Sequence, residues 1–98
     1  MRKDSIITGS NHNVYIDGKL LDPRLSQAYR NHSPDGFSWG YSGSGPSQLA
    51  LALLLEVCLD KDQAQAHYQD FKFDVVAGLD ETFTLNASVI YDWCEKNI

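Results

Sequence analysis

One continuous apolar stretch stands out in the pattern of hydrophobic and polar positions. Between residues 46 and 59 nearly every side chain is apolar, and Gln48 and Glu56 are the clear polar exceptions. Because apolar residues fall on all faces of a helix at these positions, the pattern predicts a helix buried at the centre of the domain. Pro46 suits the first turn of this helix, where its missing N–H costs no hydrogen bond.

Two further helices are predicted in the second half of the chain. Residues 63–77 carry apolar side chains at spacings of four, three and four, which form one amphipathic stripe. Asp62 is expected to cap this helix and Gly78 to follow its end. A short extended segment at 83–85 comes next, and Asn86 is expected to cap the last helix. The apolar side of that helix is expected to consist of Val89, Ile90 and Trp93.

Short apolar runs and turn residues predict a small sheet near the N-terminus. The runs at 13–16 and 19–22 are separated by Asp17-Gly18, a strong hairpin signal, since a type I′ turn needs positive φ at both central residues. A third strand is predicted near 5–8. The whole pattern predicts an α+β fold, in which a small antiparallel β-hairpin or three-stranded sheet packs with three α-helices around the central helix.

The length and charge of the chain limit the domain organisation and the kinds of partner that can be expected. The 98 residues suffice for one domain, in which residues 1–5 are expected to form a flexible lead. The net charge is −5, and it is uneven: up to Pro46 the chain has five basic and four acidic residues, and after it three basic and nine acidic ones. No basic stripe is present, so direct binding of duplex DNA is not expected. The acidic half suits a basic partner instead, through Asp60, Asp62, Asp70 and Asp74.

The lengths of the apolar runs and the surroundings of the two cysteines indicate the cellular compartment. No apolar run is long enough to span a bilayer, and the N-terminal residues lack the features of a secretory signal, so a cytoplasmic protein is expected. For a phage protein this means the host cytoplasm. Cys58 and Cys94 fall among apolar neighbours, without a second ligand at metal-binding spacing. They are therefore expected to be buried, reduced and unreactive thiols.

The candidate functional site is the segment 31–46, called here the glycine-rich stretch. It contains four glycines, four serines and two prolines, and it follows an irregular or short helical link expected at 24–31. Glycines let backbone N–H groups approach a ligand closely, and the free N–H groups of the following helix favour negative charge. The stretch therefore predicts a site for an anionic, nucleotide-like ligand.

Each candidate residue has a role in this hypothesis. Trp39 and Tyr41 would stack on a planar ring, while Arg24 and Arg30 would hold a phosphate or carboxylate. Ser44 or Gly45 is expected to cap the helix. The proposed ligand-binding residues are Arg24, Arg30, His32, Trp39, Tyr41, Gly43, Ser44, Gly45 and Ser47.

A simpler interpretation of the same stretch needs no ligand. Phe37, Trp39 and Tyr41 are spaced two apart, like one face of an extended segment packed on the core. The glycines would then serve only to let that segment lie close to the helix.

Enzyme signatures in the stretch are incomplete. Residues 40–44 lack the closing glycine of a nucleophile elbow, and residues 43–48 lack the third glycine of a dinucleotide fingerprint. His32, Asp35 and Ser44 supply the residue types of a nucleophilic triad, so a hydrolase using His32 is a third hypothesis. No catalytic activity, cofactor or metal is expected. In particular, no metal-ligand spacing on a helix involves His12, His32 or His67.

A long motif joins the glycine-rich stretch to the helix that follows. From His32 to Leu54 it reads His-Ser-Pro-x-Gly-Phe-x-Trp-Gly-Tyr-x-Gly-Ser-Gly-Pro-x-Gln-Leu-Ala-Leu-Ala-Leu-Leu. With this motif the chain resembles an uncharacterised family of small bacterial, plasmid and phage proteins, a domain of unknown function, over about residues 14–93. The resemblance implies no established activity.

Two binding functions are therefore expected, from different classes. In the first, a small non-enzymatic protein of a phage or other mobile element sequesters a host signalling nucleotide at the glycine-rich stretch. In the alternative, an acidic, anti-CRISPR-like antagonist binds a basic surface of a host defence complex. A homo-oligomer is compatible with either function.

Overall fold

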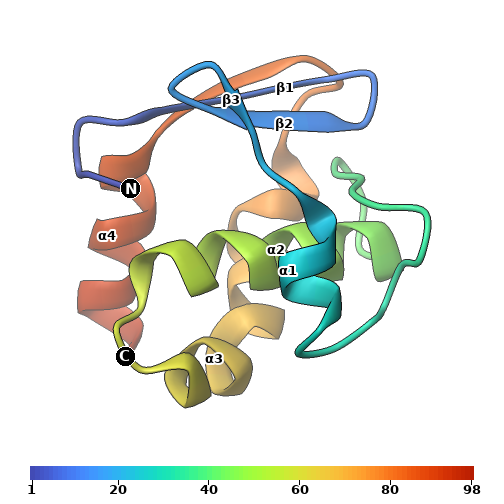
Figure 1. Ribbon diagram of the computed structural model, residues 1–98. Helices are drawn as coiled ribbons and strands as arrows, with labels where there is room; N and C mark the ends of the chain where they lie inside the picture. Colours follow the sequence, from blue (N-terminus) through green and yellow to red (C-terminus); the bar gives the residue numbers. More distant parts are fainter.

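The chain folds into a four-stranded antiparallel sheet packed against helices, as a computed structural model describes for residues 1–98 (Figure 1). The elements, in chain order, are β1 (Ile6–Ser10), β2 (Asn13–Ile16), β3 (Lys19–Leu20), α1 (Pro23–Gln27), α2 (Ser44–Val57), α3 (Lys61–Asp74), the 3₁₀ turn η1 (Val76–Gly78), β4 (Phe83–Asn86) and α4 (Ala87–Asn97). The predicted α+β fold is confirmed. None of its helices has the length and apolar character that crossing a bilayer requires.

The sheet has the strand order β3-β2-β1-β4. The predicted hairpin is present, and Asp17 and Gly18 both have positive φ, as a type I′ turn requires. The extended segment predicted at 83–85 is the strand β4, which pairs with β1 and widens the expected three-stranded sheet to four. Gly9 lets β4 lie close, because a Cβ at this position would be 2.1 Å from the ring of Phe83.

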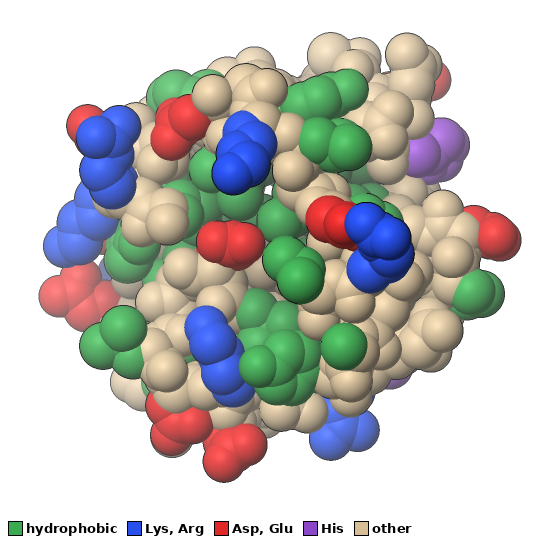
Figure 2. Space-filling view, viewed as in Figure 1, with side chains coloured by type: hydrophobic (Ala, Val, Ile, Leu, Met, Phe, Trp, Pro, Cys, Tyr) green, Lys and Arg blue, Asp and Glu red, His purple; other side chains and the backbone are tan.

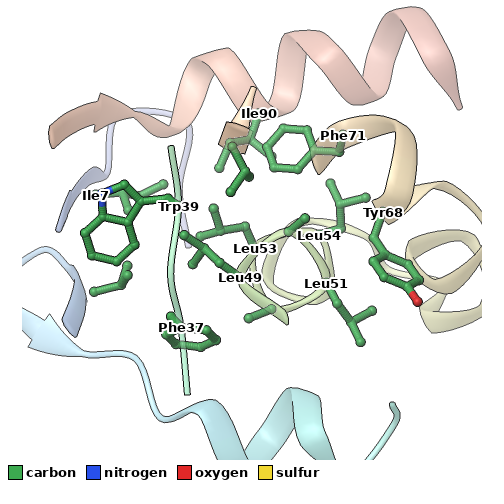
Figure 3. Close-up of a cluster of buried hydrophobic side chains, with 14 of the residues drawn as sticks. Ile7, Phe37, Trp39, Leu49, Leu51, Leu53, Leu54, Tyr68, Phe71 and Ile90 are labelled. Atoms are coloured by element: carbon green, nitrogen blue, oxygen red, sulfur yellow. The ribbon is translucent and has the colours of Figure 1, made fainter. Parts of the chain in front are cut away.

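The core surrounds α2, which runs between the sheet and α3 (Figure 1). Every residue of α2 from Gly45 to Leu54 is buried, so the prediction of a central helix is confirmed. In Figure 3 the leucines of α2 point in several directions toward side chains of the surrounding elements. The labelled side chains are Ile7, Phe37, Trp39, Leu49, Leu51, Leu53, Leu54, Tyr68, Phe71 and Ile90.

The ends of α2 and α3 differ from the prediction by a few residues. Helix α2 begins at Ser44, with Gly43 rather than Ser44 or Gly45 as the N-cap, and no side chain bonds to the cap. Asp60, not Asp62, caps α3, since its carboxylate accepts a hydrogen bond of 2.9 Å from the N–H of residue 62. Gly78 ends η1 instead of α3.

Two shorter segments also differ. The strand predicted at 19–22 stops at Leu20, because Asp22 caps a helix that begins at Pro23; the link predicted at 24–31 is thus a helix in its first part. In the lead at residues 1–5, positions 2–4 are exposed, Ser5 is buried, and the Met1 carbonyl oxygen accepts a 2.6 Å hydrogen bond from the Tyr91 hydroxyl. The flexibility of this lead stays a prediction.

Three predicted positions on α2 and α4 are less buried than expected. Ile90 and Trp93 are buried, but Val89 is 41% exposed and faces away from the core. Cys58 and Cys94 are free, as predicted, yet both are half-buried rather than buried. The reason for Cys58 is that it follows the last residue of α2, where the helix leaves the core.

Candidate functional site

The side chain of Gln48 links the glycine-rich stretch to the N-terminal end of α2 by hydrogen bonds. This side chain is fully buried, and its Oε1 accepts hydrogen bonds from the backbone N–H groups of His32 (2.8 Å) and Ser33 (3.1 Å). Its Nε2 donates to the Ser26 hydroxyl (2.8 Å) and to the Arg30 carbonyl oxygen (3.1 Å). One amide thus joins α1, the glycine-rich stretch and α2. The sequence signal was a lone polar residue in an apolar helix, but its partners are set by the tertiary fold.

Two of the predicted site residues, His32 and Ser47, bond to α3. His32 Nε2 lies 2.5 Å from the Tyr68 hydroxyl oxygen, and the Ser47 hydroxyl donates to Gln69 Oε1 at 3.2 Å. The side-chain partner of His32 is thus Tyr68, and no hydrogen bond joins His32 to Asp35. The hydrolase using His32 stays a hypothesis.

The aromatic residues divide between the core and the surface. Trp39 is 8% exposed, its indole N–H donates to the carbonyl oxygens of Asp80 (2.8 Å) and Glu81 (3.1 Å), and its ring packs edge-on against Phe83. Burial therefore leaves little of the Trp39 ring for a ligand to stack on, although Trp39 does line one depression described below. Tyr41 is 53% exposed and remains available.

The glycines at the start of α2 allow close packing. A Cβ at Gly45 would lie 2.6 Å from Ser38 Cβ, and one at Gly43 would lie 2.6 Å from the Tyr41 ring. The segment before the helix therefore lies directly against its first turn. This agrees with the packing interpretation of the stretch.

A polar depression of about 400 Å³ lies over the stretch. It shares His12 and Ser38 with a neighbouring depression of about 450 Å³. The polar residues that line the two depressions are Asn11, His12, Ser33, Asp35, Ser38, Tyr41, Ser44, Asp80 and Glu81. Apart from a histidine, the titratable groups here are acidic or phenolic, and no arginine or lysine lines either depression.

Neither of the two arginines predicted to hold an anion lines these depressions. The guanidinium of Arg24 forms an ion pair of 2.7 Å with Asp22; this hydrogen-bonded contact raises the pKa of Arg24 and lowers that of Asp22. Arg30 is exposed, and its backbone carbonyl, held by Gln48, is the part with a defined contact. Neither arginine lines a depression over the glycine-rich stretch, and their binding of an anion stays a prediction.

The largest cavity, about 770 Å³, is a groove between α1 and the C-terminal half of α2. We call it the α1–α2 groove. Its apolar lining consists of Leu21, Leu25, Ala28, Tyr29, Ala52 and Leu55, and its charged lining of Asp22, Arg24, Glu56 and Lys61. Figure 2, with α1 toward the viewer, shows apolar side chains interspersed with acidic and basic ones on this face.

Large apolar side chains are exposed along this groove. Leu25 is 65% exposed and Tyr29 47%, and a smaller hollow that includes Leu20, itself 55% exposed, continues the groove to the sheet edge. This groove was not predicted from the sequence, because the residues of α1 were expected to form only an irregular or short helical link. The spacing of Leu25 and Tyr29 by four residues, after a Pro at the helix start, was the available signal.

The four carboxylates predicted to bind a basic partner are all exposed. Two of them also have structural contacts: Asp60 caps α3, and Asp74 accepts a 2.8 Å hydrogen bond from the Trp93 indole N–H. Asp62 and Asp70 have free carboxylates. No group of three or more His, Cys, Asp or Glu side chains comes together in a way that would hold a metal ion.

Comparison with known proteins identifies the family of the chain but gives no function for it. No curated protein and no solved structure matches it. The model of a family of unknown function, DUF6166, matches residues 4–96. This match covers nearly the whole fold, including the glycine-rich stretch and the α1–α2 groove, and it agrees with the resemblance carried by the motif from His32 to Leu54. The chain therefore belongs to the DUF6166 family.

Proposed function

We propose that this protein is a non-enzymatic, protein-binding module that holds its partner in the α1–α2 groove. The observation that carries the proposal is the groove itself, an apolar hollow of about 770 Å³ flanked by exposed Leu25 and Tyr29. Contiguous exposed apolar surface on a small domain is typical of an interaction site, because it stays costly to hydrate until a partner covers it.

The groove suggests the kind of partner. An apolar floor suits one or two large apolar anchors, and the charged lining of both signs suits polar groups beside them. An amphipathic helix has this arrangement, with anchors on one face and charges flanking them. The free carboxylates of Asp62 and Asp70 would add attraction toward a basic partner. An antagonist of a host defence complex is one protein of this type.

The test is site-specific photo-crosslinking in cells. A photoreactive phenylalanine analogue replaces Leu25 in the groove, or Phe73 on α3 as the matched control, since the two side chains are 65% and 61% exposed. We expect a discrete cross-linked protein from position 25 and none from position 73.

The partner found in this way is then purified and its affinity measured by calorimetry. Leu25→Asp should lower the affinity at least about tenfold, as loss of an anchor side chain does, and Phe73→Asp should leave it unchanged. Equal cross-linking at both positions, or an affinity that Leu25→Asp does not change, would refute the proposal.

A second candidate is binding of an anionic, nucleotide-like ligand at the glycine-rich stretch. The observation in its favour is the polar depression of about 400 Å³ beside exposed Tyr41. It ranks second because Arg24 and Arg30 line neither depression. Calorimetry with a panel of nucleotides tests it: Tyr41→Ala should weaken binding about tenfold if the ring stacks on a base, and Arg30→Ala should do so if its side chain reaches the phosphate. If the unmodified protein binds no nucleotide, this candidate fails and the protein-binding proposal is unaffected.

A further inference from the structure

A second groove lies at the opposite end of α2 from the glycine-rich stretch. It measures about 420 Å³ and is lined by the end of α2, the segment that leads into α3, and the last turns of α4. Its apolar lining consists of Val57, Cys58, Leu59, Tyr91, Cys94 and Ile98. The two cysteines of the protein therefore share one accessible hollow.

The two thiols share this groove although they are far apart in the sequence. Cys58 is the C-cap of α2 and Cys94 lies in α4, and both residues line the same hollow of about 420 Å³. Both are free and half-buried. Cys58 has extended backbone geometry (φ −76°, ψ 126°), although its N–H still donates to the Leu54 carbonyl oxygen at 2.8 Å. A disulfide needs the two Cβ atoms about 3.5–4.5 Å apart, and two half-buried thiols that line one hollow from separate elements are candidates for such a bond.

We propose that Cys58 and Cys94 are a modification site, a dithiol that exchanges with a small-molecule disulfide of the glutathione type to form an intrachain disulfide. In the first step the Cys58 thiolate attacks one sulfur of oxidised glutathione, which forms a mixed disulfide and releases one glutathione thiolate. In the second step the Cys94 thiolate attacks the Cys58 sulfur and releases the second glutathione. The two protein thiols together lose two electrons and two protons. The electrons and the protons pass to the oxidised glutathione, which leaves as two molecules of reduced glutathione.

The surroundings of the two thiols give the order of the steps. Burial raises the pKa of Cys58, but the neighbouring Cys94 thiol and the positive charge of Lys61 partly offset it. Burial, followed by the negative charge of an ionised Cys58, raises the pKa of Cys94 to about 12. Because the thiolate is the nucleophile, Cys58 attacks first and Cys94 resolves the mixed disulfide.

The bond would tie the C-terminal turns of α4 to the end of α2. A cross-link between distant positions stabilises a fold mainly by restricting the unfolded chain. The oxidised protein should therefore melt several degrees higher than the reduced one, as expected for a disulfide in a domain of about this size.

The test uses the full chain, reduced and then incubated with oxidised glutathione at about pH 8.5, near the ordinary thiol pKa. Intact mass should fall by two hydrogen atoms, and a protease digest should link the peptides that carry Cys58 and Cys94. Cys94→Ser should accumulate one glutathione at Cys58, because nothing resolves the mixed disulfide. Cys58→Ser should gain glutathione much more slowly.

Three results would overturn the proposal. One is a wild-type protein that keeps one or two glutathione adducts without an intrachain bond. Another is a disulfide between two chains. The third is no reaction at all under conditions in which the protein reacts once unfolded in urea. Comparison of the melting temperatures of oxidised and reduced wild-type protein needs no variant, and an oxidised form that melts lower would count against the proposal as well.

Discussion

At the scale of single residues, Gln48 is the polar group on which the glycine-rich stretch depends. Replacing it with leucine fills a similar volume but leaves two N–H groups, a hydroxyl and a carbonyl without their partner. A buried polar group left unpaired costs about 1–3 kcal/mol, so Gln48→Leu should lower the free energy of unfolding by at least about 2 kcal/mol. Urea denaturation measures this. Gln63→Leu, at an exposed position of α3, is the control and should change stability by less than about 0.5 kcal/mol.

Gly45 tests whether close packing explains the glycines. A Cβ there would meet Ser38 Cβ at 2.6 Å and the Ser38 backbone nitrogen at 3.1 Å, so Gly45→Ala must push the segment away from α2. Such overpacking should cost about 1–3 kcal/mol. Gly78→Ala is the matched control, because its Cβ would meet nothing within 4 Å and its φ is not positive; it should be neutral or slightly stabilising. Equal melting temperatures of the two variants would show that the stretch does not press on the helix.

At the scale of elements, the leucines of α2 hold the layers together. Leu51 and Leu54 are both fully buried in the core. Truncation of a buried leucine costs about 2–5 kcal/mol through lost burial and the cavity left behind, so Leu51→Ala and Leu54→Ala should both melt well below wild type. Leu59→Ala removes a leucine that is fully exposed and should melt within about a degree of wild type. A small effect at Leu51 and Leu54 would contradict the central position of α2.

Some elements of this fold could be predicted from the sequence and others could not. Helix α2 and the Asp17-Gly18 hairpin were predictable, because an apolar run and a turn dipeptide are local signals. The pairing of β4 with β1 was not, because it joins residues more than seventy positions apart and depends on Gly9 making room for Phe83. Local patterns do not encode which distant segments meet.

The candidate site likewise has parts that could be predicted from the sequence and parts that could not. The glycine-rich stretch was visible in the sequence, and so was the alternative that its aromatic residues pack on the core, which the burial of Phe37 and Trp39 supports. The separation of Arg24 from the stretch was not visible, because it follows from the ion pair with Asp22 at the start of α1. The α1–α2 groove and the hollow lined by both thiols form only when separate helices pack together. No sequence motif therefore predicts them.

At the scale of the whole molecule, one core connects every layer. The cluster of 19 buried apolar residues includes side chains from β1, β2, α2, α3, β4 and α4, together with Phe37 and Trp39 of the glycine-rich stretch. Neither the sheet nor any helix has a second core of its own. The protein should therefore unfold in a single cooperative step, with the glycine-rich stretch released together with the rest.

The two tryptophans allow a direct test of this cooperativity. Trp39 reports on the glycine-rich stretch and Trp93 on the packing of α4 against α3, and both are 8% exposed. Trp93→Phe leaves Trp39 as the only indole, and Trp39→Phe leaves Trp93. For each variant, urea unfolding followed by fluorescence should coincide with unfolding followed by far-ultraviolet circular dichroism. If the Trp39 signal changes at a lower urea concentration than the dichroism of the same variant, the stretch opens while the helices remain folded. That result would contradict a single core and would make the stretch a separately opening segment over the end of α2.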